Sequence, residues 1–191
     1  MSPRSGLKGN AMRAALYLVM VALFPAASFA ADVTVDQADA LMNEARACDK
    51  AGDKICVFDR MHTVLSSDAV LDELAKQPNG ARLYWFGFYK TGIEVVEAAP
   101  NEDKVAYADR AIALLEDRFP GQDDAAMVFH MMRAEAYAEL GDLAAGKGSA
   151  EKALDGYVQV ATIGNDSTAL MSADAVADRL TRLSLLYKDA F

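Results

Sequence analysis

The sequence predicts an all-α fold of seven or eight helices paired as antiparallel hairpins, and three observations lead to this prediction. After residue 32, almost every segment places apolar residues at the three- and four-residue spacing of an amphipathic helix. No segment sustains the alternation of apolar and polar residues that is typical of a half-buried strand. Clusters of Gly, Pro, Asn and Asp interrupt the pattern at short intervals, as expected of helices joined by tight turns.

Residues 1–30 precede this pattern and have the parts of a secretory signal peptide. They contain three cations and no acid, followed by an apolar run over 14–24, a proline, and small residues at Ser28 and Ala30. A membrane-spanning helix needs about 20 apolar residues. The run is shorter, so we expect cleavage after Ala30 rather than the alternative, an uncleaved anchor. The sequence therefore predicts a single mature helical-repeat domain over 31–191, located in the periplasm or secreted.

The composition limits the class of partner. The chain has 19 Lys and Arg against 28 Asp and Glu, so removing the three cations of the signal segment changes the net charge from −9 to −12. Nucleic-acid binding needs a basic face, which argues against nucleic acid as the main partner. A partner attracted by charge should be basic. We expect no stable membrane insertion of the mature chain.

The expected helices follow one another with little intervening chain, and most begin with a capping signal. Thr34 and Gln37 form a capping box at the start of the first helix. Asn101 is expected to cap the fifth helix, and 164–167 to form the turn before the last one. The approximate ranges are 34–52, 53–65, 66–77, 81–98, 101–118, 123–140, 143–161 and 173–186.

Cys48 and Cys56 are the only cysteines of the chain and flank a turn signal over 49–54. In an oxidising compartment an even number of cysteines usually forms bridges. We therefore predict a disulfide that joins the first two helices across this turn. A zinc site would want a second cysteine pair, and a thiol oxidoreductase would want C-x-x-C spacing, so redox and metal roles are the less favoured alternatives.

Two predicted turns share the pair Gly-Asp, at 52–53 and at 141–142. The run around the second turn, RAEAYAELGDL over 133–143, is followed by AEKAL over 150–154. This sequence resembles the tetratricopeptide repeat, in which a small residue and a tyrosine lie between paired helices, Gly-Asp turns the chain, and a later alanine packs under the next helix. The resemblance assigns these positions to Ala134, Tyr137, Gly141, Asp142 and Ala153.

The resemblance implies a short solenoid, that is, a superhelix of α-α hairpins, which binds proteins or peptides and performs no chemistry of its own. The chain departs from the family pattern at three positions. Gly146 stands where the family prefers Ala, Ala150 where it prefers an aromatic residue, and Arg133 where it prefers Leu. The alternative is an irregular helical bundle in which the Gly-Asp turns occur by chance.

Motifs for chemistry are missing, so we predict no catalytic residue, no metal and no cofactor. The chain has no G-x-S-x-G, S-x-x-K or H-E-x-x-H motif and no Gly-rich phosphate loop that follows a strand. Met127, His130 and Met131 would suit copper(I), but core packing explains the same methionines without a metal. The alternatives to protein binding are a small-ligand or metal-binding module and a small hydrolase without a recognisable motif.

The segment 83–89 is the most aromatic of the chain and suggests where a ligand would bind. Consecutive aromatic residues on a helix cannot all face one way, so some of them should point outward or into a groove. We predict a candidate ligand groove formed by Tyr84, Trp85, Phe88 and Lys90. The alternative is a central helix whose aromatic residues all lie in the core.

Overall fold

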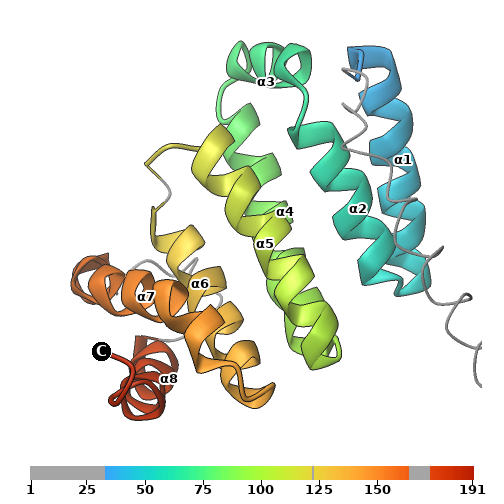
Figure 1. The fold of residues 1–191 in the computed structure, drawn as a ribbon. Coiled ribbons are helices and arrows are strands. Elements are labelled where there is room, and N and C mark those ends of the chain that lie inside the picture. Colours follow the sequence, from blue (N-terminus) through green and yellow to red (C-terminus); the bar gives the residue numbers. More distant parts are fainter. Residues whose placement is uncertain (1–32, 122, 164–172) are drawn as a thin grey trace, which may run out of the picture. The chain divides into compact units, whose positions relative to one another are not determined.

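The computed structural model describes residues 33–121, 123–163 and 173–191, which belong to one compact unit, Asp32–Phe191 (Figure 1). These residues form helices and no strand, which confirms the all-α prediction. The expected signal segment and the expected turn at 164–167 lie outside the described residues. The helices are α1 (Val35–Ala51), α2 (Lys54–Leu65), α3 (Asp68–Ala75), α4 (Gly80–Ala98), α5 (Asn101–Arg118), α6 (Asp123–Glu139), α7 (Leu143–Ile163) and α8 (Ala173–Leu186).

The starts of α1, α2 and α3 have side-chain caps, whereas those of α4 and α5 do not. The capping box of Thr34 and Gln37 is present at the start of α1. At the start of α5, however, Asn101 is the first helical residue and makes no side-chain cap. Pro100 takes the cap position instead, because its carbonyl accepts the N–H groups of both Asp103 and Lys104 at 2.9 Å. The helix therefore starts one residue earlier than the expected cap allows.

The two Gly-Asp turns are built alike. Gly52 and Gly141 each adopt a left-handed conformation with φ of 77°, which a residue with a side chain rarely adopts. The aspartate that follows each glycine then accepts the backbone N–H three residues further on at 3.0 Å. The same two residues thus end one helix and start the next, at α1–α2 and at α6–α7.

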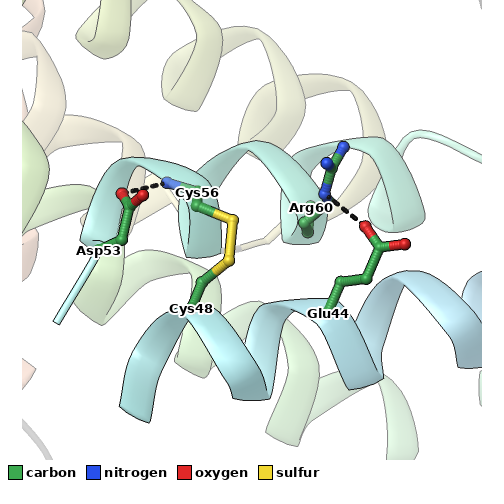
Figure 2. Close-up of a disulfide and its surroundings, with 5 residues drawn as sticks. All are labelled: Glu44, Cys48, Asp53, Cys56 and Arg60. Carbon is green, nitrogen blue, oxygen red and sulfur yellow. Dashed lines mark hydrogen bonds and ion pairs between the residues drawn. A yellow bond between two sulfur atoms is a disulfide. The ribbon is translucent and has the colours of Figure 1, made fainter. Parts of the chain in front are cut away.

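Cys48 and Cys56 form a disulfide between α1 and α2, with their Cα atoms 5.9 Å apart (Figure 2). One end of the bridge lies beside the turn, where Asp53 caps the N–H of Cys56. Further along the same two helices, Arg60 Nε lies 2.9 Å from Glu44 Oε2. With the ion pair of Lys54 and Asp49 at 2.8 Å, three side-chain links hold this hairpin together.

The described helices pack mainly on their neighbours in the chain. Figure 1 shows α1 beside α2 and α6 beside α7, and α5 packs against both α4 and α6. In addition, α6 contacts both α4 and α8. Phe58 stacks on Phe88 at 4.9 Å between ring centroids in the core, and Tyr107 meets Phe58 edge-on. The α4, α6 and α8 row carries the candidate site described below.

A buried tyrosine fixes the C-terminal end of the chain against α6 and α7. Tyr187 is completely buried and donates its hydroxyl proton to the carbonyl of Ala134 at 2.8 Å. A Cβ added at Gly146 would lie 1.9 Å from the Tyr187 oxygen, so only glycine leaves room for this contact. The departure from the repeat pattern at Gly146 therefore has a structural reason in this chain.

Candidate functional site

The four residues of the predicted aromatic groove do not face one common groove. Phe88 is completely buried against Phe58, so it belongs to the core and cannot border an open groove. Tyr84 and Trp85 are half-buried and pack on the core. Of the four, only Lys90 is exposed. The physical reason is the helical register, since the face of α4 that carries Phe88 continues into buried Val95 and Val96.

A different stripe of α4 faces the solvent. Leu83 is 69% exposed, and Phe86, three residues later, is half-buried. Residues spaced by three or four positions share one face of a helix. The outward residues, which we call the α4 stripe, are Arg82, Leu83, Phe86, Lys90, Glu94 and Glu97. The 3–4–4–3 spacing of Leu83, Phe86, Lys90, Glu94 and Glu97 is the sequence signal that would have found it.

A cavity of about 460 Å³ lies at the C-terminal end of this stripe. Its floor is apolar, and charged side chains form its rim. Volumes of this order are typical of sites that bind small molecules. The described residues that line it come from α4, α6 and α8 and from the first turn of α5: Val96, Glu97, Lys104, Met132, Glu135, Ala136, Glu139, Arg179, Arg182 and Leu186.

Arg179 joins the three helices of the cavity. Its Nε atom donates to Glu135 Oε1 at 3.0 Å, and its Nη2 group also contacts the Glu135 carboxylate. Its Nη1 group donates to Glu97 Oε1 at 3.1 Å. The side chains of Arg179 and Glu135 are only 17% and 21% exposed. Burial alone would lower the pKa of Arg179, but the hydrogen bonds and charges of Glu135 and Glu97 outweigh it and raise the pKa.

The other charges at the cavity are bound more loosely. Lys104 Nζ lies 3.6 Å from Glu139 Oε2, which is an ion pair without a hydrogen bond. Arg182 Nε lies 3.4 Å from Asp178 Oδ2, and both side chains are well exposed. An exposed pair such as Arg182 and Asp178 contributes about 0–1 kcal/mol, so it can be exchanged for contacts with a partner at small cost.

The described lining of the cavity offers carboxylates and cations. Among these residues there is no Ser, Thr, Cys, Tyr or His, whereas the three glutamates and Lys104 belong to residue types that can transfer protons. Six of the ten lining residues are charged and four are apolar, so the cavity can contact both polar and apolar groups of a ligand. The site residues that the sequence reasoning missed are Glu97, Glu135 and Arg179. Arg179 could have been noticed as the single cation between Val176, Leu180 and Leu183 on an otherwise apolar helix face.

Both histidines lie away from the cavity lining. His62 stands beside Phe58 and Phe88, and burial, followed by the Arg110 guanidinium, lowers its pKa to about 4. His130 is buried on α6, and its Nε2 atom lies 2.9 Å from Glu116 Oε1. Burial lowers the pKa of His130 as well, in spite of this carboxylate.

The methionines of the copper alternative lie in the core. Met127 and Met131 are both buried there, as core packing predicts. Within the described part of the chain, no three His, Cys, Asp or Glu side chains are close enough together to hold a metal ion.

The positions assigned by the repeat resemblance lie around the α6–α7 hairpin. Ala134 and Ala153 are completely buried at helix contacts, and Tyr137 is half-buried. Arg133, which replaces a leucine of the family pattern, donates to Ser149 Oγ at 2.6 Å and contacts Asp109. These polar contacts link α6 to α7 and to α5.

No protein-family model, no curated protein and no solved structure matches this chain. In the described residues, none of the helices combines the length and the apolar character needed to cross a bilayer. The disulfide is compatible with an extracellular or periplasmic protein.

Proposed function

We propose that the chain is exported through a signal peptide over 1–30, cleaved after Ala30, and acts as a non-catalytic binding protein for protein or peptide segments. Residues 31–191 form the binding domain, built from hairpins that resemble tetratricopeptide repeats. The cavity across α4, α6 and α8 is the observation that carries the proposal. The mature protein is located in the periplasm or in the extracellular space under this proposal.

The arrangement of the helices supports a repeat-like binding domain. In repeat proteins each unit contacts only its neighbours, and the first helices of successive units line one face that binds the partner. Here α4 pairs with α5 and α6 with α7, while α6 contacts both α4 and α8, and residues of all three helices line the cavity. The cavity therefore lies where a repeat protein would hold its partner.

The charges of the cavity support a partner with polar and apolar groups rather than an apolar ligand. The floor offers Val96, Met132 and Ala136, whereas Glu139 and Arg182 stand at the rim with much of their side chains exposed. A peptide supplies both kinds of group along one chain. The net charge of −12 expected for the mature chain favours basic partners at long range.

A selection from a random dodecapeptide library tests the proposal. The full chain is purified from a secreting host, so that its N-terminus is processed as the cell processes it, and the enriched peptides are measured by fluorescence anisotropy. Glu139→Arg should weaken binding about fivefold to tenfold, as expected for reversal of a rim charge, and Arg182→Glu, which adds an acid at the rim, should change the affinity in the opposite direction. Glu151→Arg, an exposed acid of α7 that does not line the cavity, is the matched control and should bind normally.

Two results would contradict the proposal. One is the absence of any enriched peptide that binds the purified protein. The other is a set of bound peptides whose affinity is the same for the rim variants and for the wild-type chain. Mass spectrometry of the secreted protein tests the proposed cleavage, since an N-terminus other than residue 31 would contradict it.

A further inference from the structure

We propose that an extended protein segment binds along the α4 stripe, with acidic and apolar residues against Arg82–Lys90 and a basic residue at the cavity. This inference rests on the binding function proposed above and specifies the chemistry of the partner. It follows from the distribution of charge along the stripe, the exposed apolar residues within it, and its continuity with the cavity.

The first half of the stripe lies in an exceptional stretch of the chain. Residues 74–93 contain no Asp or Glu and three cations, and no other acid-free stretch after Asp32 is as long. The chain around it has an excess of acids. An acidic group of a partner would be repelled from most of the surface but attracted here, so the first half of the stripe selects for acidic residues.

Two apolar side chains lie between the cations of this half. Leu83 and Phe86 stand between Arg82 and Lys90, and Leu83 is the most exposed of the large hydrophobic residues in the described chain. Neither Arg82 nor Lys90 forms an ion pair within the described residues. Both cations can therefore bind a partner without breaking an internal pair, while the partner covers Leu83 and Phe86.

The second half of the stripe has the opposite charge. Glu97 shares Arg179 with Glu135, so this group of three carries one carboxylate charge in excess, within a cavity lining that has three acids and three cations. Glu94, one turn earlier, shares Lys54 with Asp49, and the charge of Lys90 also acts on Asp49. A basic side chain of a partner fits this end, where the Glu97 carboxylate is about half-exposed.

Helix geometry sets the spacing of the partner's charges. The basic pair is Arg82 and Lys90. Its midpoint lies nearly ten residues from the midpoint of Glu94 and Glu97, which is about 14 Å along the helix at 1.5 Å per residue. An extended chain covers about 3.3 Å per residue, so the acidic and basic residues of the partner should be separated by about four positions.

The same observations disfavour an anionic membrane as the partner. Leu83, Phe86 and two cations would suit the surface of an anionic bilayer. The stripe, however, continues into Glu94 and Glu97, which such a surface would repel. A peptide with segregated charges satisfies both halves at once.

Affinity measurements on stripe variants test the inference with the peptides enriched in the library selection. Lys90→Glu and Leu83→Ser should each weaken binding about fivefold to tenfold. The peptides enriched on the wild-type chain should carry acidic and basic residues about four positions apart. Lys188→Glu and Leu185→Ser are the matched controls, because Lys188 is exposed and Leu185 is 64% exposed on α8. Both controls should bind like the wild-type chain.

The outcomes separate this inference from the proposed function. If no library peptide binds, the proposed function fails and the inference fails with it. Only the inference is overturned if peptides bind and lose affinity with Glu139→Arg but not with Lys90→Glu or Leu83→Ser. The same holds if the bound peptides lack acidic and basic residues about four positions apart. Binding to phosphatidylglycerol vesicles that disappears in the two stripe variants, without peptide binding, would overturn it in favour of a membrane surface.

Discussion

Replacing Arg179 by leucine should destabilise the protein more than any other single change of a charged residue at the cavity. The guanidinium is only 17% exposed and holds Glu135, which is 21% exposed, through contacts with both carboxylate oxygens. Leucine would leave the Glu135 carboxylate largely buried without its counter-charge. It would also release Glu97 on α4, so α8 would lose its side-chain link to that helix.

The magnitude follows from the burial of the two carboxylates. Removing one partner of a buried ion pair costs about 3–5 kcal/mol, mostly because the other charge stays buried and unpaired. Glu135 retains some exposure, and Glu97 is half-exposed and adds at most about 1 kcal/mol. We therefore expect a loss of about 3 kcal/mol in the free energy of unfolding. For a chain of this size that corresponds to a Tm about 6–12 °C lower.

Urea denaturation followed by circular dichroism measures this loss, and two further variants make the result specific. Arg182→Leu, an exposed arginine on the same helix, should change the free energy of unfolding by less than about 0.5 kcal/mol. The double variant Arg179→Leu/Glu135→Leu should recover at least about 1.5 kcal/mol relative to the sum of the two single variants, because no buried charge remains unpaired. A loss below about 1 kcal/mol for Arg179→Leu, or additive effects in the double variant, would refute the reasoning.

Three further predictions concern the disulfide, the C-terminal tyrosine and pH. Replacing Cys48 and Cys56 by serine should lower the free energy of unfolding by about 2.5 kcal/mol in urea, the loop-entropy value for a separation of 8 residues, and equal stability would contradict this. Tyr187→Phe should cost about 1 kcal/mol in the same assay, and Gly146→Ala about 1–3 kcal/mol. A stabilising Gly146→Ala, as helix propensity alone predicts, would show that the tyrosine does not occupy this space. The pKa of His62 is lowered to about 4 in the folded chain, so between about pH 6.5 and pH 4 the unfolded chain binds a proton at this histidine more readily than the folded chain does. The free energy of unfolding should therefore fall as the pH drops from about 6.5 to 4. His62→Gln should reduce that fall, which urea midpoints at pH 7 and pH 4.5 can measure.

Local signals in the sequence were sufficient for the parts of the fold that depend on neighbouring residues. The capping box at Thr34 and the Gly-Asp turns at 52–53 and 141–142 each depend on groups three or four residues apart, so the sequence contains all the participants. The disulfide spans a turn of the same kind. At Asn101 the local signal fails, because the neighbouring Pro100 takes the N-cap position of α5.

The candidate site could not be predicted in the same way, because it depends on residues far apart in the chain. Arg179 and Glu97 are 82 residues apart, and no local pattern indicates that they meet. On α4, composition drew attention to the aromatic residues, yet Phe88 is in the core and Leu83 faces the solvent. Which face of a helix is covered depends on its neighbours, and here α2 and α6 cover the aromatic face.

Stability and binding share some residues of the cavity, and this decides which variants can report on function. Arg179 and Glu135 hold α8 against α6, so a binding defect in their variants would not distinguish a lost contact from a displaced helix. Lys90 and Leu83 are exposed, and Lys90 acts on Asp49 only through its charge. Their replacement should leave the free energy of unfolding nearly unchanged, as surface substitutions usually do. Loss of peptide affinity at unchanged stability in these two variants is therefore the result that would separate recognition by the α4 stripe from a general loosening of the fold.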